Sequence, residues 1–352
     1  MRTMRMNGSL LTCVNSGNSV PASASLYGLS VASAQEIRYG VAVGLSITLL
    51  VGVIGNLLMG LVLADNLRTS RSPISMLTCT FMVNVTVSDL LFLIYNVPVM
   101  LLSFVFEDWA MGLSVCVSSQ SMSMWTMFCS FYSMVATSVL RYVAVVHPMC
   151  NLTFSRRQRL GLVTLMWALS FLVSIPSWLH QEVAGVGHGT FCIFCMTELQ
   201  TFLYFVLFGG VAFLPAVLIM AACYWEIIRF LWGWHASVRH TDHGRQHKNR
   251  KVTTTILAIV TAFIVMWAPY WVVTFLMTNR SLPQKPLVFV VSSLATLLAY
   301  SNCCISPIIY FALSEQFRLG LRKLFKRQPR RTLTSEIYHL NSALYAMISG
   351  KG

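Results

Sequence analysis

The feature that most constrains this chain is a series of seven long apolar stretches separated by short polar segments. Each stretch is long enough to cross a hydrocarbon core of roughly 30 Å as a helix, which takes about 20 residues. Because only helices and closed barrels satisfy their backbone groups in lipid, the stretches predict an all-α membrane protein, a seven-transmembrane helix bundle. The predicted spans are residues 39–64, 74–102, 114–146, 160–179, 201–231, 252–278 and 286–311.

The distribution of lysine and arginine predicts how these spans are oriented. Of the 25 basic residues, all but five lie in one alternate set of connections, at its helix ends, or in the tail after residue 311. The five on the other side are Arg2, Arg5, Arg38, Arg280 and Lys285. The positive-inside rule then places the N-terminus outside and the C-terminus in the cytosol of a multi-pass plasma-membrane protein. This topology explains the net charge of +14 better than a nucleic-acid partner does, and contact with anionic membrane lipid is a secondary expectation.

The chain is expected to form one membrane domain with two flanking segments. We assign residues 1–36 to an extracellular tail, 37–312 to the seven-helix domain, and 313–352 to a short amphipathic helix and a cytosolic tail. Residues 1–36 contain no long apolar run before a small-residue cleavage site, so no cleaved signal peptide is expected and the first span serves as the membrane signal.

Three of the ten cysteines are predicted on the outer side near the third span. A disulfide from Cys116 to Cys192 or Cys195 would tie the loop between spans four and five over the helix ends. Cys192 is the first choice, but the sequence does not separate the two. Most of the other cysteines lie within spans and are expected to act as small apolar residues. No zinc spacing is present, and the histidines near 235–247 have no thiolate beside them.

Two glycosylation sequons are predicted to face outward, at Asn7 and Asn279. The sequons at Asn84 and Asn151 are predicted to lie in a span and on the cytosolic side, where they would stay unmodified.

Asp89 is the only acid near the middle of a predicted span. A carboxylate at a helix centre costs about 2.5–3.5 kcal/mol on insertion scales, so such residues usually mark function or pair internally. Polar partners at comparable depth are Asn56, Ser130, Asn302 and Ser306. Oxygen ligands around one carboxylate suit a small hard cation or a water cluster. The alternative is a protonated Asp89 in a structural hydrogen-bond network, and no other cofactor or metal is expected.

Prolines inside five spans predict kinks, because each removes a backbone hydrogen bond. They are Pro98, Pro176, Pro215, Pro269 and Pro307. Phe263 and Trp267 lie four residues apart just before Pro269, so both are predicted to point inward beside a kink, although ordinary packing aromatics have the same pattern.

Motifs that occur in order, one or more per span, give the chain a specific resemblance over about residues 37–327. They are Gly55-Asn56; Asn84 and Ser88-Asp89-Leu90; Trp109, Gly112 and Cys116; Arg141-Tyr142 with His147-Pro148; Trp167; Pro215; Phe263 with Trp267 and Pro269; and Asn302, Pro307 and Tyr310 before Ser314-Glu315-Gln316-Phe317-Arg318. Together they resemble rhodopsin-like (class A) G-protein-coupled receptors. The stretch LAYSNCCISPIIYFALSEQFR and the YNVP around Pro98 resemble neuropeptide receptors of the galanin-receptor type. Ser177-Trp178 and the PYWV after Ala268 are similar to an orphan galanin-receptor-like branch.

The resemblance implies switching roles for several of these residues. Arg141 would engage a heterotrimeric G protein or a neighbouring helix in the active state. Asp89, Ser130 and Asn302 would form a sodium site that favours the inactive state. Trp267 would sense ligand with Phe263 below it, and Tyr310 would swing inward on activation. Arrestin and receptor kinases would be further partners.

The segment 314–325 would lie along the inner leaflet as an amphipathic helix. Its apolar side reads Leu313, Phe317, Leu321, Leu324 and Phe325.

The chain departs from the family pattern at four positions. Leu140 stands where an acid precedes the arginine, and Ser306 stands where asparagine precedes Pro307. Asn249 occupies the place of an acid that faces the arginine in some members, and Tyr224 falls nine residues after Pro215 instead of eight. These departures put normal switching in question and leave the fold unaffected.

The predicted pocket is neutral and aromatic. Amine receptors carry an aspartate where this chain has Ser123, and opsins carry a lysine where it has Tyr300, so both classes are disfavoured. The predicted lining is Gln120, Ser123, Met124, Phe128, Tyr270, Trp271, Thr274, Thr296 and Tyr300. Acids gather outside at Glu36, Glu107, Asp108, Glu182 and Glu198, so we expect a peptide ligand with a neutral aromatic end and a modestly basic body.

Two other function classes fit the sequence less well. A secondary transporter would show internal repeats and broken, charge-paired spans, and a membrane enzyme would need a catalytic cluster around Asp89. Neither pattern is present. The nearest alternative is a receptor-fold protein that acts as a scavenger or an arrestin-biased receptor without G-protein coupling.

Overall fold

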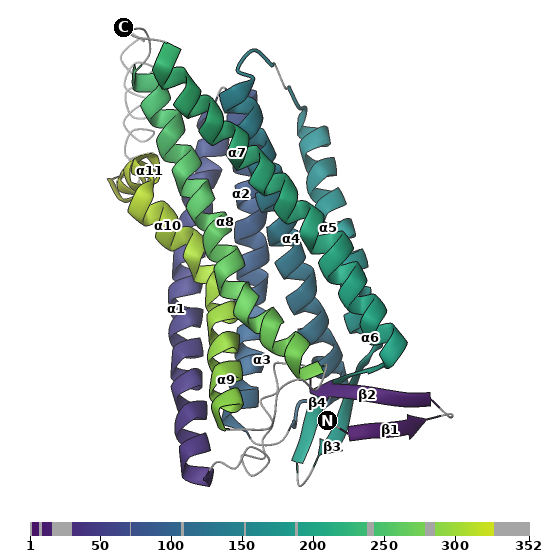
Figure 1. Cartoon of the computed structure of the whole chain (residues 1–352). Helices are drawn as coiled ribbons and strands as arrows, with labels where there is room; N and C mark the ends of the chain where they lie inside the picture. The colour runs from purple at the N-terminus through teal and green to yellow at the C-terminus, as the bar shows by residue number, and fades with distance from the viewer. Residues whose placement is uncertain are drawn as a thin grey trace, which may run out of the picture.

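The computed structural model describes residues 2–6, 9–15, 30–70, 72–106, 109–150, 153–186, 189–237, 243–278 and 286–326. Within this part of the chain, seven helical segments are long and apolar enough to cross a membrane, as the sequence predicted. They stand side by side as one bundle (Figure 1).

Four of the seven spans are continuous helices, and three are joined from shorter helical pieces. The continuous ones are α1 (Val31–Thr69), α4 (Gly112–Val146), α5 (Arg156–Leu179) and α8 (His243–Thr278). The second span joins α2 (Pro73–Leu91), the π-helix η2 (Phe92–Asn96) and α3 (Val97–Val105). The fifth joins α6 (Glu198–Phe205), the π-helix η3 (Val206–Phe213) and α7 (Leu214–Ser237). The seventh joins α9 (Pro286–Ser301), the 3-10 turn η4 (Asn302–Cys304) and α10 (Ile305–Leu313), and α11 (Glu315–Lys326) follows it.

Apolar side chains on the outside of the bundle identify the surface that meets lipid. On α1 the exposed large residues recur every three or four positions, at Val43, Ile47, Leu50, Ile54, Leu57 and Leu61. A stripe of this spacing occupies one helix face. In water so extended an apolar face would be unfavourable, whereas in a bilayer it is the expected surface.

Capping side chains set where several helices begin. Ser30 accepts a hydrogen bond from the backbone N–H of Ser33, so α1 starts within the segment that hydropathy assigned to the N-terminal tail. A capping box of Ser155 and Gln158 opens α5. Such caps satisfy the unpaired N–H groups of a first turn, which apolar periodicity alone does not reveal.

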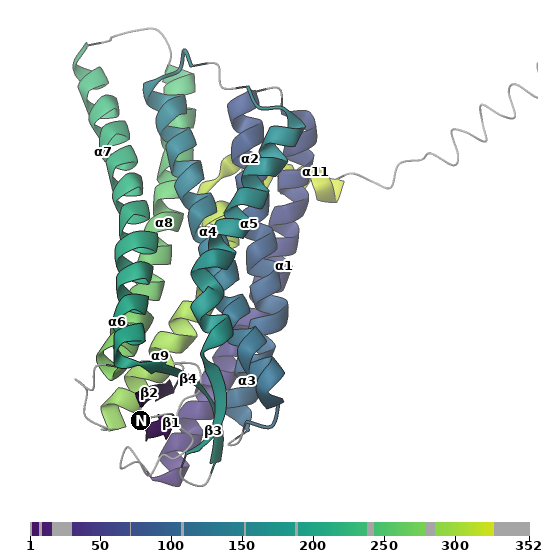
Figure 2. The ribbon, with the colours of Figure 1, turned by 90° about the vertical axis from the view of Figure 1, so that its right-hand side faces the viewer.

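Helix α4 is the centre of the bundle. It packs against α2, α5 and α7, and Figure 2 shows it between α7 and α8 on one side and α1 and α2 on the other. The main hydrophobic core includes Phe128 and Phe131 of α4 together with residues of α1, α2, η3, α7, α8, α9, α10 and α11. Side chains of α4 can therefore couple the two ends of the molecule through continuous packing.

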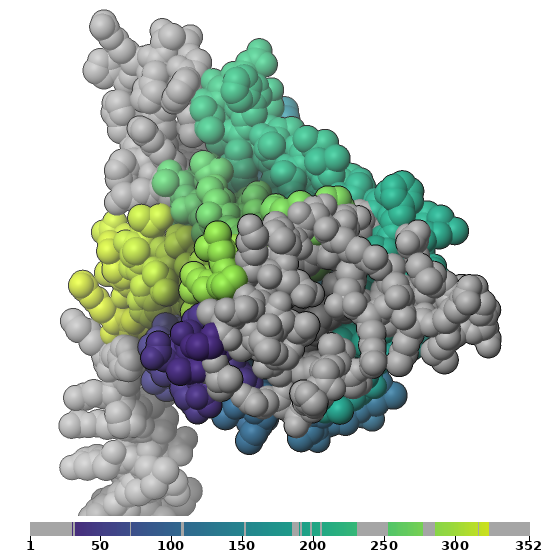
Figure 3. Space-filling model, turned by 60° about the horizontal axis from the view of Figure 1, so that its bottom comes forward, coloured from purple at the N-terminus to yellow at the C-terminus, as the bar shows by residue number. Residues whose placement is uncertain are grey.

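A four-stranded antiparallel sheet at one end of the bundle was not predicted. Its order is β1-β2-β4-β3, formed by β1 (Arg2–Met6), β2 (Ser9–Asn15), β4 (Gly189–Thr197) and β3 (Gln181–Val186). We call this end the sheet end and the opposite end, where α11 lies, the α11 end (Figure 1). Figure 3 looks toward the sheet end, where the first turns of α1 lie beside α9.

Two of the five prolines follow helical turns that are wider than α. The π-helix η2 ends two residues before Pro98, and η3 ends two residues before Pro215. In η2 the N–H of Val97 bonds to the carbonyl of Phe92, five residues back. Such a turn inserts one residue into the helix and rotates the side chains that follow. The sequence predicted kinks at these prolines but not the widened turns.

Candidate functional site

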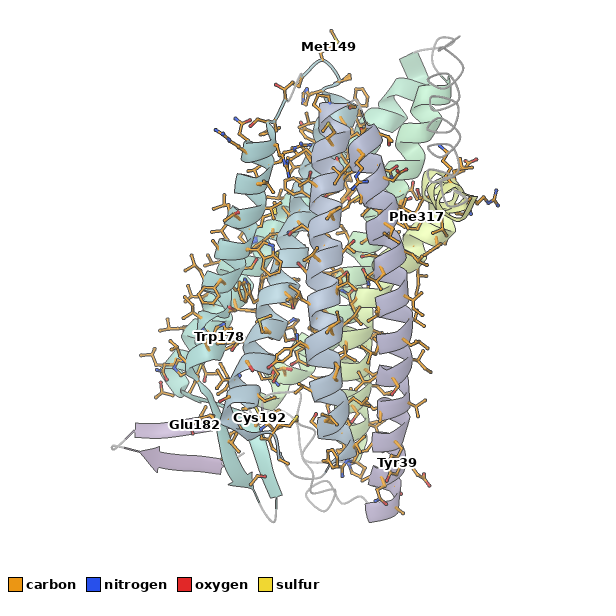
Figure 4. The ribbon with its side chains drawn as sticks, turned by 180° about the vertical axis from the view of Figure 1, so that it is seen from behind. Tyr39, Met149, Trp178, Glu182, Cys192 and Phe317 are labelled. Atoms are coloured by element: carbon orange, nitrogen blue, oxygen red, sulfur yellow. A yellow bond between two sulfur atoms is a disulfide. The ribbon has the colours of Figure 1, made fainter. Side chains whose placement is uncertain are left out.

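The loop that carries β3 and β4 is tied to the start of α4 by a disulfide between Cys116 and Cys192. The two Cα atoms are 5.5 Å apart, and the bond confirms the first choice between the two possible partners. Cys195 is also disulfide-bonded, but not to Cys116. Figure 4 shows Cys192 and Glu182 at the sheet end, where this loop covers the helices.

Trp109 reinforces the attachment of this loop. Its backbone N–H donates to the carbonyl of Thr190, at 2.8 Å, and its ring N–H donates to the carbonyl of Gly112, also at 2.8 Å. Gly112 has φ of 76°, a left-handed conformation that favours glycine. Trp109 packs with the Cys116–Cys192 disulfide in one buried cluster.

A small cavity lies beneath this loop, between α3, α4 and α9. Gln120 and Tyr300 line it, as predicted, together with Asn96, Trp109 and Cys192. Asn96 was not among the predicted pocket residues. A usable signal was an uncharged polar residue two positions before a proline inside an apolar span.

The other predicted pocket residues do not line this cavity. Phe128 is fully buried and makes an edge contact with Phe208, with ring centroids 4.9 Å apart. The ring centroid of Trp271 lies 4.2 Å from that of Phe208 and 5.5 Å from that of Tyr270, so these rings form a packed aromatic cluster. Four further predicted residues, all of them buried or half-buried, are Ser123, Met124, Thr274 and Thr296.

A second cavity, deeper in the bundle, brings Asp89, Ser130 and Asn302 together with Phe263 and Trp267. Ser130 donates to Oδ1 of Asp89 at 3.1 Å. One carboxylate, one hydroxyl and one side-chain amide in a single cavity form a hard oxygen set that suits sodium. The described residues contain no cluster of three His, Cys, Asp or Glu side chains, so neutral oxygens would complete the coordination.

Two residues expected near Asp89 lie outside the lining of this deeper cavity. The side-chain amide of Asn56 donates instead to the carbonyls of Gly52, at 2.9 Å, and Cys303, at 2.8 Å. It thereby connects α1 to the seventh span. Ser306 is buried but does not line the cavity.

The predicted aromatic pair sits beside the deeper cavity. Phe263 stacks on Phe131, with ring centroids 5.3 Å apart and planes 15° apart. Trp267 is buried, and its ring N–H has no hydrogen-bond partner in the described structure. Pro269 lies inside α8, as predicted. These rings connect the deeper cavity to the aromatic cluster nearer the sheet end.

Around Arg141, the described part of the chain shows no replacement for the missing acid. The Nε of Arg141 is buried and has no hydrogen-bond partner among the described residues. Although Tyr224 is displaced by one residue from the family spacing, it is buried and its hydroxyl lies 3.1 Å from that of Ser138.

Leu140 and Tyr310 have apolar surroundings. Leu140 is buried with Leu77 and Phe81, so it serves packing between α2, α4 and α5. Tyr310 is buried, and its hydroxyl donates to the sulfur of Met82 at 3.1 Å. Near Tyr310, a methyl group added at Gly55 would lie 3.0 Å from the side chain of Pro307, so the two helices are closely packed there.

The predicted amphipathic helix is present as α11. Phe317 is buried against Tyr310 and Phe311, and Leu321 packs on the same core. The side chain of Leu313, which precedes α11, is partly exposed. Figure 4 shows Phe317 turned toward the bundle at the α11 end.

Asn84, the sequon predicted to lie in a span, is buried in a polar cluster. It accepts a hydrogen bond from the ring N–H of Trp167 at 2.8 Å and donates to the hydroxyl of Ser133 at 2.8 Å. Other predicted positions fall outside the described residues or side chains: Asn7, Glu107, Asp108, Asn151, Glu198, the histidines at 235–247, Asn249, Asn279, Leu324, Phe325 and the tail after 326.

Comparison with known proteins yields consistent similarities. Residues 55–310 match the family described as 7 transmembrane receptor (rhodopsin family). Galanin receptor type 1 of Mus musculus is 30% identical over 299 residues, which cover 82% of this chain and 84% of the receptor. Galanin receptor 2a of Danio rerio is 28% identical over 306 residues, covering 85% and 81%. Melanin-concentrating hormone receptor 1 of Pan troglodytes is 32% identical over 249 residues, covering 68% and 69%.

Proposed function

Because the chain belongs to the rhodopsin family of seven-transmembrane receptors, we propose that it binds an extracellular peptide at the sheet end and signals to a heterotrimeric G protein from the α11 end. The observation that carries this proposal is the cavity beneath the disulfide-bonded loop, lined by Gln120, Tyr300 and Asn96. Deeper in the bundle, a continuous core runs from Met124 and Tyr270 to Tyr310 and Phe317 near the other end.

The orientation in the membrane follows from charge. The basic residues gather in the connections and tail at the α11 end, so this end faces the cytosol and the N-terminus lies outside. Helix α11 carries Arg318, Arg322 and Lys323 beside its apolar side, which suits the anionic inner leaflet. In this orientation the sequons at Asn7 and Asn279 would lie on the outer side, where glycosylation takes place.

A peptide is the ligand class that the site favours. The relatives are receptors named for galanin and for melanin-concentrating hormone. No charged side chain lines the cavity beneath the disulfide-bonded loop, whereas Glu36 and Glu182 are exposed at the sheet end. A neutral aromatic peptide end would enter the bundle while a modestly basic body meets these acids.

The deeper cavity supplies the switch in this proposal. Sodium held by Asp89 with Ser130 and Asn302 would favour the inactive state. Trp267, which lines the same cavity, would change position when ligand binds. Tyr310 and Arg141 would rearrange at the α11 end, where the G protein, arrestin and receptor kinases would dock.

Guanine-nucleotide exchange in membranes that express the chain tests the proposal. Galanin, melanin-concentrating hormone and a neuropeptide library are applied in turn, and an active peptide raises exchange in wild type but not in Arg141→Ala. Peptide uptake without any exchange, at verified surface expression, would contradict coupling and favour the scavenger or arrestin-biased alternative.

A further inference from the structure

We propose that Asn96 forms a subsite for a primary carboxamide in the cavity beneath the Cys116–Cys192 disulfide. The group would be a C-terminal amide or an Asn or Gln side chain of the peptide. This inference rests on the proposed peptide-receptor function and adds to it the chemistry of one contact.

Asn96 is a polar side chain that the protein buries without pairing it. Its exposed fraction is 2%, and neither its side-chain oxygen nor its side-chain nitrogen has a hydrogen-bond partner among the described residues. Buried polar groups in folded proteins are almost always hydrogen-bonded, because an unpaired one loses its contacts with water. Both ends of the same amide are therefore available to a group that enters the cavity.

The local backbone turns Asn96 into this position. It is the last residue of η2, where the N–H of Val97 bonds to Phe92 five residues back. Pro98 follows and has no N–H to restore the α-helical pattern. The widened turn rotates the side chain toward α4 and α9, and π-turns of this kind are frequent at functional sites.

The surroundings select the chemistry of the partner. Asn96 shares the cavity with Ser119, Gln120, Tyr300 and the apolar Val99 and Met100, and none of the lining residues carries a charge. A carboxylate or an ammonium group would lose its hydration there without gaining a counter-ion. An amide offers Asn96 one acceptor and two donors, which match the donors and the acceptor of Asn96 itself. The cavity has room for about one water molecule, so an entering carboxamide group would take the place of a water beside Asn96.

The first test needs no ligand. Asn96→Leu removes two unpaired polar atoms and keeps a similar volume, so the purified receptor should unfold at the same temperature as wild type or a higher one. A hidden structural role for Asn96 would lower that temperature and overturn the proposal, whatever the receptor's signalling.

The second test uses two small probes on the purified receptor. N-acetyl-leucinamide has about 12 non-hydrogen atoms and should bind with roughly millimolar affinity and raise the unfolding temperature. N-acetyl-leucine, which ends in a carboxylate, should raise the unfolding temperature less. The substitution Asn96→Leu should weaken the binding of N-acetyl-leucinamide by about tenfold. Ser103→Ala is the matched control, because Ser103 lines the same cavity but donates to the carbonyl of Met100 at 2.7 Å. Equal protection by both probes, equal protection of wild type and Asn96→Leu, or no protection of wild type would overturn the subsite. Nucleotide exchange tests coupling separately.

A different observation carries a second inference: we infer that Cys195 is bonded to Cys13, which fixes the N-terminal hairpin β1–β2 to the loop over the pocket. Cys195 is disulfide-bonded, Cys116 and Cys192 bond to each other, and the six remaining described cysteines are free thiols. Of the ten cysteines in the chain, this leaves Cys13.

The strand register supports the same pairing. Cys13 of β2 lies directly opposite Cys195 of β4. Directly opposed residues of antiparallel strands have Cα atoms roughly 4.5–5.5 Å apart, within the range that a disulfide spans. Cys195 stands three residues after Cys192, so the two point to opposite faces of β4, one toward the helices and one away. To form the bond, the two thiols give up two protons, and their two electrons reduce the disulfide of an oxidoreductase by thiol–disulfide exchange.

Mapping of the non-reduced protein tests the pairing. Digestion without reduction should release a Cys13–Cys195 cross-linked peptide, and Cys195 should react with a maleimide only after reduction. In Cys13→Ser the thiol of Cys195 should become reactive without reduction, whereas Cys150→Ser, which removes an exposed free thiol, should leave Cys195 protected. Alkylation of Cys195 in the unreduced wild type, or its recovery with any other cysteine, would overturn the inference.

Discussion

Ser130 of α4 donates a hydrogen bond to the carboxylate of Asp89 on α2, with 3.1 Å between the two oxygens. This contact crosses between two helices at the wall of a cavity that also reaches Asn302 and Trp267. It joins the acid that the sequence singled out to the helix at the centre of the bundle, so a cation bound here would lie among residues from four spans.

Asp89→Asn should therefore remove a sodium effect on signalling. In wild type, replacing choline by sodium should lower ligand-free nucleotide exchange, by about fourfold for a site whose Kd is one third of the sodium concentration. Asp89→Asn should show equal exchange in both salts. Ser138→Ala is the control, since it removes a hydroxyl of α4 that bonds to Tyr224 outside the cavity. A sodium response that persists in Asp89→Asn would assign the acid to the structural network.

Cys116→Ser should loosen the loop over the pocket. The disulfide closes a separation of 76 residues, and such a link is worth about 4 kcal/mol in the chain-entropy model. Surface expression of the variant should fall sharply and its unfolding temperature should drop. Cys150→Ser, at an exposed free thiol, should behave as wild type. Normal expression and stability of Cys116→Ser would show that the loop is held by other contacts.

Leu140→Asp should lower ligand-free activity. An acid beside Arg141 would give the inactive state a charge-assisted contact worth about 1.5–3 kcal/mol, and 1.4 kcal/mol is one decade of population. Basal nucleotide exchange at matched surface density should fall by about tenfold, while Leu140→Asn, of the same shape without the charge, should not fall. A silent wild type that signals only as Leu140→Asp with Ser306→Asn would instead identify a receptor that has lost coupling.

Trp167→Phe should destabilise the bundle. The ring N–H of Trp167 bonds to the side-chain oxygen of Asn84, which is buried between α2, α4 and α5. Its loss leaves a buried acceptor unpaired at about 1–3 kcal/mol. Trp225→Phe, at an exposed tryptophan on α7, should stay within about 0.5 kcal/mol of wild type. Thermal unfolding of the purified proteins compares the two, and equal temperatures would contradict this account.

Gly52→Ala should separate α1 from its neighbours. A methyl group at Gly52 would lie 2.6 Å from a side-chain carbon of Leu93 and 3.1 Å from the sulfur of Cys304, and Leu93 is fully buried with little room to move. Overpacking of this kind typically costs about 1–3 kcal/mol. Gly40→Ala on the same helix has no atom within 4 Å and should be neutral or stabilising, because alanine favours helix. Thermal unfolding that ranks the two the other way would argue against close packing at Gly52.

Much of the candidate site followed from the sequence. Asp89 was identified because an acid in an apolar span is costly, and the structure places two of its four expected partners, Ser130 and Asn302, in the same cavity. Asn56 and Ser306 sit at similar depth but outside that cavity, because depth along a helix does not determine which way a side chain points. Similarly, Leu140 stood out as a missing acid, and only its packing against Leu77 and Phe81 shows what it does instead.

The sequence by itself determined the seven spans, because a bilayer requires local runs of apolar residues long enough to cross it. The tertiary structure decided the features that depend on residues far apart in the chain. The pairing of β2 with β4 joins segments about 180 residues apart, and the choice of Cys192 over Cys195 depends on which side of β4 turns toward Cys116. The orientation of Asn96 depends on one widened turn before Pro98. Hydropathy measures how apolar a segment is, whereas these features depend on rotation and register, which packing sets between elements.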